Sequence, residues 1–273
     1  MRIAVVAPGS MGAGVAQRLR LRGAEVAMTL EGRSAASGGR AAGMRLFDSE
    51  AALVGRAEVV LSIVPPGEAL ALARRLAPVL AGRVFADCNA VSPATVAAVA
   101  EALPGVDFVD IGIIGGPPKG EDAGPRLYAS GASAGTLSAL TDWGIDLRPI
   151  DGGVGAASAL KMSYAGITKG LTALGSAMAL GAVRSGAAAA LHAELAASQP
   201  GLLAYFERSV PDMFDKAYRW VAEMEEISSY LEGMPGAGMY AGAAELYAAV
   251  AADRATAGAD GMVARLAGFF AKS

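Results

Sequence analysis

The sequence is poor in the residues that build metal centres and disulfide frameworks. Its 273 residues include one cysteine, Cys88, and one histidine, His192. A single cysteine excludes an internal disulfide framework and a cysteine-based metal cluster. A single histidine excludes zinc sites that need several histidines, and it argues against a Ser-His-Asp triad. We therefore expect no metal, and we expect any chemistry to depend on other side chains or on a bound organic cofactor.

Charge and long apolar runs are also scarce. Charged residues make up 18% of the chain, the formal net charge is −3, and no basic run offers a footprint for DNA or RNA. Although 53% of the residues are hydrophobic, the longest uncharged helical stretch, Gly170 to Val183, is well short of the roughly 20 residues that span a bilayer. The apolar run after Arg2 is too short for a secretory signal. We expect a soluble, cytoplasmic protein with no nucleic-acid or membrane partner.

The first half of the chain alternates between apolar runs and helical patterns. Strands are expected over residues 2–7, 25–30, 59–64, 83–87 and 106–114, and helices over residues 11–22, 68–80 and 93–103. Uninterrupted apolar strands that alternate with helices indicate a parallel sheet covered on both faces. The sequence therefore predicts an α/β fold, with a Rossmann doubly wound parallel sheet as the NAD(P)-binding domain over residues 1–153.

The second half has no convincing strand pattern. Helices are expected over residues 156–185, 188–197, 201–207, 211–232 and 240–256. We therefore predict an all-α domain over residues 154–273 that completes the substrate site. Because this half is apolar and rich in alanine, we also expect it to form a homodimer.

A glycine-rich turn follows the first expected strand. Its pattern, Ala7-Pro-Gly9-Ser-Met-Gly12, matches the dinucleotide fingerprint G-x-G-x-x-G with alanine at the first position. The helix that opens here would present free N–H groups to phosphates. A tight turn without a ligand is the alternative, which the position between strand and helix disfavours. We expect the cofactor to bind at Pro8, Gly9, Ser10, Met11 and Gly12.

Residues after the second expected strand give opposite indications of the cofactor. Glu31 lies 19 residues after Gly12, near the place where the fingerprint has an acidic residue for the ribose 2′-OH of NAD. Arg33 and Ser34 follow at once, and an arginine with a hydroxyl can instead bind the 2′-phosphate of NADP. We expect NADP rather than NAD, because Gly32, Arg33 and Ser34 offer a phosphate nest and a charge. The alternative for Arg33 is a solvated loop charge.

Four later segments carry short motifs that follow the glycine turn along the chain. They are Val64-Pro65, Asp87-Cys-Asn-Ala-Val-Ser-Pro93, Asp110 with Gly115-Gly116, and Gly152-Gly-Val-Gly155 with Lys161. Together with the glycine turn they resemble, in order, the motifs of the β-hydroxyacid dehydrogenases, a family that includes 3-hydroxyisobutyrate and 6-phosphogluconate dehydrogenases. The C-terminal half resembles a little-characterised subgroup with a 6-phosphogluconate dehydrogenase-like C-terminal domain. The resemblance implies a Rossmann domain, a helical domain, NAD(P) and a catalytic lysine.

Several residues near the carboxyl ends of the expected strands are candidates for ligand contact, because open α/β sheets bind ligands at that edge. Asn89 is expected to contact the cofactor, and the resemblance assigns Val64-Pro65 to the same site. Ser92 is expected to bind substrate. Gly115 and Gly116 are expected to do the same through unhindered backbone N–H groups.

The chemistry is expected to depend on Lys161. Five lysines stand against 18 arginines, so a lysine in a largely apolar helix is unusual for this chain. Burial can tune an ammonium towards neutrality, which suits a general base for a substrate hydroxyl and a general acid in carbonyl reduction. A snorkelling lysine at a helix start is the alternative. Tyr164 shares the helical face of Lys161 and is a candidate substrate hydrogen-bonder, with a core aromatic as the alternative.

Other polar residues are expected to be structural. Lys169 is expected to pair with a glutamate, although it could hold an acid group of the substrate. Glu223 and Glu226 are expected on a solvated or inter-subunit face, with contact to the substrate as the alternative. Cys88 is expected to be a small apolar filler, because no positive neighbour would activate its thiol.

Three departures from the family pattern bear on the substrate. Asn89-Ala90 replaces Ser-Thr, Ile114 replaces a serine, and Tyr164-Ala165 stands where the family has asparagine. We therefore expect an oxidoreductase that acts on a small β-hydroxyacid or a related hydroxy or oxo acid other than the standard short ones. An imine reductase and a non-catalytic NADP-binding protein stay open as alternatives.

Overall fold

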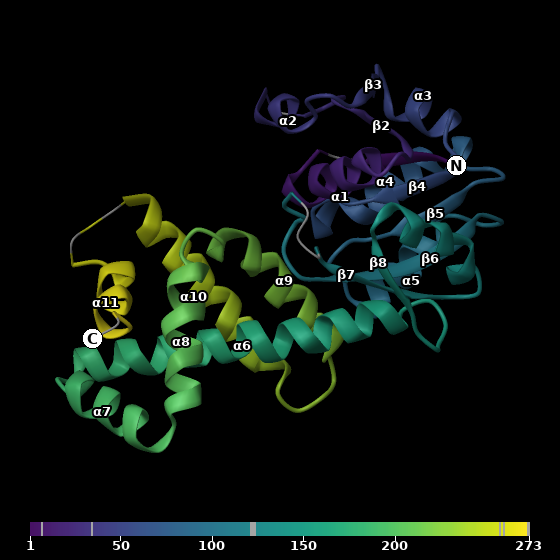
Figure 1. The fold of residues 1–273 in the computed structure, drawn as a ribbon. Helices are drawn as coiled ribbons and strands as arrows, with labels where there is room; N and C mark the ends of the chain where they lie inside the picture. The colour runs from purple at the N-terminus through teal and green to yellow at the C-terminus, as the bar shows by residue number, and fades with distance from the viewer. Residues whose placement is uncertain (7, 34, 121–123, 257, 259, 272–273) are drawn as a thin grey trace. The chain divides into compact units, whose positions relative to one another are not determined.

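A computed structural model describes residues 1–6, 8–33, 35–120, 124–256, 258 and 260–271. The chain divides into two compact units, residues 1–162 and residues 163–273 (Figure 1). The division falls inside the helix α6 (Ala156–Arg184), which begins in the first unit and continues into the second.

One eight-stranded sheet forms the centre of the first unit, in the order β3-β2-β1-β4-β5-β6-β7-β8. The strands are β1 (Arg2–Val6), β2 (Glu25–Thr29), β3 (Arg45–Phe47), β4 (Val59–Ser62), β5 (Val84–Asp87), β6 (Asp107–Ile114), β7 (Arg126–Ser130) and β8 (Asp146–Pro149). The parallel order 3-2-1-4-5-6 is that of a doubly wound Rossmann sheet, with its switch point between β1 and β4. The predicted fold class is therefore confirmed.

Helices cover both faces of this sheet. They are α1 (Ser10–Leu21), α2 (Ala35–Arg40), α3 (Glu50–Gly55), α4 (Ala69–Leu76) and α5 (Pro93–Glu101), with the 3₁₀ helices η1 (Pro66–Glu68), η2 (Ala77–Val79) and η3 (Ala134–Trp143). One buried cluster joins the sheet to α1 and η3, and another joins it to α3, α4 and α5. Burial on both faces explains why the parallel strands consist mostly of apolar residues.

The sheet differs from the prediction at its edges. The strands β3, β7 and β8 were not predicted, and β7 runs antiparallel to β6, so the sheet is mostly but not wholly parallel. The edge strand β3 has only three residues, Arg45 and Leu46 are exposed, and it offers no buried apolar run. In β7, Arg126 and the half-buried Tyr128 interrupt the apolar residues.

In the second unit all the regular secondary structure of the described residues is helical, as predicted. After α6 come α7 (Ala188–Ser198), α8 (Pro200–Met213), α9 (Ala217–Tyr230), α10 (Ala237–Thr256) and α11 (Met262–Phe269). The predicted break near residue 207 was wrong: α8 continues through Pro211, because Phe206, Val210 and Met213 extend one buried face. Among the described residues, no helix combines the length and the apolar character that crossing a membrane requires.

Candidate cofactor and catalytic site

The glycine turn lies between β1 and α1 and has the geometry of a phosphate-binding turn. Gly9 is the N-cap of α1 in an extended conformation, and its carbonyl accepts the N–H of Ala13 at 2.8 Å. The N–H groups of residues 10–12 open the helix and have no acceptor within it. A Cβ at Gly9 would meet no atom within 4 Å, so the turn is open to a ligand, and Pro8 is buried behind it. Ala7 lies outside the described residues.

Glu31 and Arg33, which give opposite indications of the cofactor, both contact a third residue, Glu50. A carboxylate oxygen of Glu31 accepts the backbone N–H of Glu50 at 2.6 Å, at the first turn of α3. Arg33 Nη2 lies 3.4 Å from Glu50 Oε1, and Arg75 Nε lies 3.2 Å from Glu50 Oε2. The buried Nε of Arg33 has no hydrogen-bond partner among the described residues. Arg33 is therefore no solvated loop charge, while Ser34 lies outside the described residues.

A second arginine, Arg40, lies beside the glycine turn. From the end of α2 its Nε donates to the carbonyl of Pro8 at 2.7 Å, and its Nη2 donates to Ser37 Oγ at 3.1 Å. Sequence reasoning missed Arg40, because no motif or helical period marks it. It adds positive charge next to the segment where phosphates are expected.

Four buried polar residues, which we call the polar row, lie side by side in the sheet. Ser62 is the register partner of Asp87, Asp87 that of Asp110, and Asp110 that of Ser130. Each has at most 1% of its surface exposed. Because buried polar groups need hydrogen-bond partners, the residues of the polar row must bond to neighbouring segments. Its two carboxylates, Asp87 and Asp110, bond to different segments.

Asp87 holds Asn89. The backbone N–H of Asn89 donates to Asp87 Oδ1, and its side-chain amide donates to Asp87 Oδ2 and to Ser62 Oγ, each at 3.0 Å. The amide oxygen of Asn89 accepts the N–H of Val64 at 2.7 Å. Burial raises the pKa of Asp87 to about 6, although the hydrogen bonds from Asn89 oppose the rise. The same burial raises the pKa of the Cys88 thiol, which packs in the apolar core.

Asp110 holds the start of α6. Its Oδ2 accepts the N–H groups of Gly155 and Ser158, at 2.9 and 3.0 Å, and the hydroxyl of Ser130 at 3.2 Å. Its Oδ1 accepts the Ser158 hydroxyl at 2.7 Å. A carboxylate at a helix N-terminus satisfies free N–H groups and complements the helix dipole. Asp110 therefore fixes the first turn of the helix that carries Lys161.

Backbone packing also fixes Lys161. A Cβ at Gly112, in β6, would lie 2.5 Å from the carbonyl oxygen of Ala157 and 3.1 Å from the Cβ of Lys161. The first turns of α6 thus rest directly on the backbone of β6, and Lys161 is half-buried there. Tyr164 follows on the same helix, within the second unit, and is 48% exposed, so it is not a core aromatic of this chain alone.

The predicted substrate residues differ in their surroundings. Gly115, directly after β6, has φ +126°, and a Cβ there would lie 3.0 Å from Pro125 Cα, so the position favours glycine. A Cβ at Gly116 would meet no atom within 4 Å. Ser92 is fully buried, and its hydroxyl caps α5 by accepting the N–H of Thr95 at 3.2 Å. The hydroxyl of Ser92 is therefore engaged in structure.

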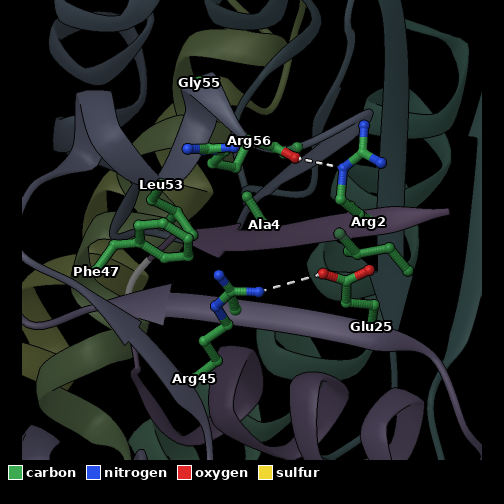
Figure 2. Close-up of a pocket in the computed structure, with 11 residues that line it drawn as sticks. Arg2, Ala4, Glu25, Arg45, Phe47, Leu53, Gly55 and Arg56 are labelled. Atoms are coloured by element: carbon green, nitrogen blue, oxygen red, sulfur yellow. Dashed lines mark hydrogen bonds and ion pairs between the residues drawn. The ribbon is translucent and has the colours of Figure 1, made fainter.

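A cavity of about 410 Å³ lies at the opposite edge of the same sheet (Figure 2). It is lined by residues at the amino-terminal ends of β1 to β3 and at the end of α3. In Figure 2, Arg45 pairs with Glu25 at 3.4 Å, and Arg2 Nε donates to the carbonyl of Arg56 at 2.7 Å. No predicted site residue lines it. Since open α/β sheets bind ligands at their carboxyl edge, the cavity does not mark the cofactor site.

A charged cluster within the second unit was partly predicted. Lys169 pairs with Glu223, as expected, and its ammonium lies 4.9 Å from the centre of the Trp220 ring. Of the two faces expected for Glu223, the solvated one was wrong, because its side chain is only 16% exposed, and the inter-subunit one stays a prediction. Lys169 therefore has an ionic partner inside the helical unit.

The comparisons with known proteins agree with this arrangement. The family described as "NAD binding domain of 6-phosphogluconate dehydrogenase" matches residues 2–141, more than half of the chain. The chain belongs to the β-hydroxyacid dehydrogenase family. A domain of unknown function matches residues 182–250, within the helical unit. This family member is an NAD(P) oxidoreductase, and its cofactor is NAD(P).

Three relatives of this family member illustrate the likeness. An uncharacterized 28.5 kDa protein of Methanothermus fervidus is 29% identical over 176 residues, which cover 64% of this chain and 68% of that protein. A conserved protein of unknown function, solved and found similar to 3-hydroxyacid dehydrogenases, is 28% identical with a TM-score of 0.71, over 92% and 96% of the two chains. A 3-hydroxyisobutyrate dehydrogenase of Mycobacterium tuberculosis, 22% identical, has the same fold, with a TM-score of 0.69 over 97% and 98%.

Proposed function

We propose that this dehydrogenase transfers a hydride between NADP and a small β-hydroxyacid or a related hydroxy or oxo acid, with Lys161 as the general acid and base. The observation that carries the proposal is the position of Lys161, which Asp110 and Gly112 fix against β6 in the same unit as the open glycine turn. When bound, the nicotinamide would supply the hydride chemistry. The ammonium of Lys161 would donate a proton to the carbonyl oxygen in reduction, and its neutral amine would accept the hydroxyl proton in oxidation.

The experiment is a cofactor-consumption screen, with NADP(H) and NAD(H) assayed separately. The panel contains short and longer β-hydroxyacids, the matching oxo acids and cyclic imines. Turnover of a hydroxyacid or oxo acid supports the proposal. Turnover of imines alone would favour an imine reductase, and no turnover in the whole panel would favour a non-catalytic NADP-binding protein.

The role of Lys161 is tested with Lys161→Ala and Lys161→Arg. General acid–base catalysis typically contributes about 10²- to 10⁴-fold, and arginine keeps the charge but cannot release a proton. We expect both variants to lose turnover on that scale while they still bind cofactor. Lys216→Ala, which removes a surface lysine paired with Asp212, is the matched control. Turnover within about threefold of wild type in Lys161→Ala would overturn the assignment.

The preference for NADP is supported by the contacts around Glu50. The carboxylate of Glu31 is engaged by the α3 backbone, which makes it a poor acceptor for a ribose hydroxyl, while Arg33 keeps a donor without a partner among the described residues. One hydrogen bond to a charged group is worth about 1.5–3 kcal/mol, so Arg33→Ala should weaken NADP about 10- to 100-fold and leave NAD nearly unchanged. Arg45→Ala, at the opposite sheet edge, is the control. A wild-type preference for NAD would refute the proposal.

We propose the remaining predicted site residues as follows. The pyrophosphate binds at Pro8, Gly9, Ser10, Met11 and Gly12. Val64-Pro65 and Asn89 face the nicotinamide half, Ser34 joins Arg33 at the 2′-phosphate, and the substrate acid group binds at Gly115 and Gly116. Tyr164 bonds the substrate from α6. Ser92 contributes through its backbone, because its hydroxyl caps α5.

A homodimer through the helical unit is also proposed. Four large apolar side chains of α6, Tyr164, Ile167, Leu174 and Met178, are between 48% and 69% exposed. Their spacings of three, seven and four residues place them along one helical stripe, which suits the self-complementary contact of a twofold dimer. Ile167→Glu should shift the protein to monomer in light scattering, whereas Leu21→Glu in α1 should not. A monomeric wild type at tens of micromolar would refute the dimer. A cytoplasmic location stays a prediction from the sequence.

A further inference from the structure

The contact between Asp87 and Asn89 orients an amide group. Both oxygens of Asp87 accept from Asn89, and Ser62 Oγ accepts from the same side-chain amide. The NH₂ end of the amide is therefore saturated by two acceptors. A side-chain amide has one donor end and one acceptor end, so its oxygen must face the other way, where it accepts the N–H of Val64 at 2.7 Å.

The hydrogen bond from Val64 to Asn89 lies where the chain has few other backbone donors. The two residues that follow, Pro65 and Pro66, have no backbone N–H to donate. The N–H of Val64 is thus the last donor before η1 that can tie this segment to the sheet. If the amide of Asn89 were released, the N–H of Val64 would lose its acceptor, and the segment would lose its fixed position.

We propose that Asp87 is a positioning residue for the cofactor: by orienting Asn89 it holds the Val64-Pro65 segment where the nicotinamide half binds. This proposal rests on the proposed function, because it takes that segment as part of the cofactor site. Asp87 itself is 1% exposed, so it acts through Asn89 and does not touch the ligand.

Protonation should weaken the arrangement. The charged or titratable groups that act on Asp87 are Asp110 on β6 and the neighbouring Cys88 thiol, and neither supplies a positive charge. A carboxylate is a stronger hydrogen-bond acceptor than a carboxylic acid. Because the pKa of Asp87 is raised to about 6 by burial, the anion that holds Asn89 is lost as the pH falls below that value.

The test compares NADP binding by wild type and by Asp87→Asn, using calorimetry between pH 5 and pH 8. The new amide has one acceptor where the carboxylate has two, so one of the two bonds from Asn89 is lost. We expect the variant to bind NADP about tenfold more weakly at pH 8, the lower end of the effect of one charge-assisted hydrogen bond. The ratio of the two dissociation constants should fall towards one at pH 5, where wild type is itself protonated.

The ratio of the two dissociation constants is the decisive quantity. The 2′-phosphate of NADP also titrates near pH 6, but it does so for wild type and variant alike, so its effect cancels in the ratio. A merely structural role of Asp87 would give a ratio that does not change with pH, and such a result would overturn the proposal. Asp107→Asn, at the exposed start of β6, is the matched control and should give a ratio of one throughout. If wild type binds neither NADP nor NAD, the proposed function fails; if it binds NADP and the ratio stays at one, only the positioning role fails.

A second variant covers the case in which Asp87→Asn does not fold. Ser62→Ala removes the other acceptor of the Asn89 amide and leaves the carboxylate in place. It should weaken NADP binding about two- to threefold, less than loss of a bond to a charged group. Unchanged binding in Ser62→Ala would count against the proposal, because the amide would then keep its orientation without this part of the row.

Discussion

Replacing Gly112 with alanine should displace the lysine on which the proposed chemistry depends. The new Cβ would lie 2.5 Å from the carbonyl oxygen of Ala157, whereas ordinary contacts begin near 3.4 Å. The start of α6 must therefore retreat by about 0.9 Å, the difference of those two distances. Overpacking of this kind costs about 1–3 kcal/mol, and a misplacement of about 1 Å can cost about 10²-fold in rate.

Gly112 lies in β6, away from the glycine turn between β1 and α1, so its substitution should affect catalysis and not cofactor binding. Gly112→Ala should lower kcat about 100-fold, lower the midpoint of thermal unfolding by several degrees, and leave the dissociation constant of NADP almost unchanged. Gly135→Ala, in η3, is the control, since a Cβ there would meet no atom within 4 Å. If Gly112→Ala keeps kcat within twofold and unfolds like wild type, the close contact of α6 with β6 does not position Lys161.

Three further changes probe the buried polar and thiol groups. Asp110→Asn should destabilise the protein by about 1–3 kcal/mol, because the N–H groups at the start of α6 lose a charged acceptor, and Asp107→Asn should change denaturant unfolding by less than about 0.5 kcal/mol. Since the pKa of Asp87 is raised from 3.8 to about 6, the folded state binds more protons than the unfolded state between those values. Wild type should therefore gain stability relative to Asp87→Asn as the pH falls from 7 to 4, by up to about 3 kcal/mol; a constant difference would contradict the assignment. Native Cys88 should resist alkylation for hours at pH 8 and react within minutes in denaturant, and rapid labelling of the folded protein would contradict its burial.

The central sheet could be predicted because its parallel strands are buried on both faces. Most residues of each of these strands are apolar, and a helix separates each strand from the next, so the alternation of strand and helix can be recognised in the sequence. The edge strands lack that property. Arg45 and Leu46 of β3 are exposed, and Arg126 and Tyr128 interrupt the apolar residues of β7, so no local sequence pattern predicts the pairing of either strand.

The candidate site divides in the same way. The glycine turn and Lys161 could be predicted, because a turn between strand and helix and a rare lysine in an apolar helix are local features. The polar row could not, because Ser62, Asp87 and Asp110 meet only through the register of β4, β5 and β6. Register is a property of the folded sheet. For the same reason the sequence could not predict that the amide oxygen of Asn89 accepts the N–H of Val64.

The buried side chains of the motifs suggest how a divergent family member can keep its cofactor. Four buried side chains hydrogen-bond to other parts of the protein: Asp87, Asn89, Ser92 and Asp110. The groups that these segments can still present to a ligand are therefore largely backbone groups. Backbone groups are present whatever the side chain is, provided that the segment keeps its position. A substitution such as asparagine for serine at position 89 is then tolerated when the new side chain still anchors the neighbouring strand. The demand on these four positions is therefore geometric.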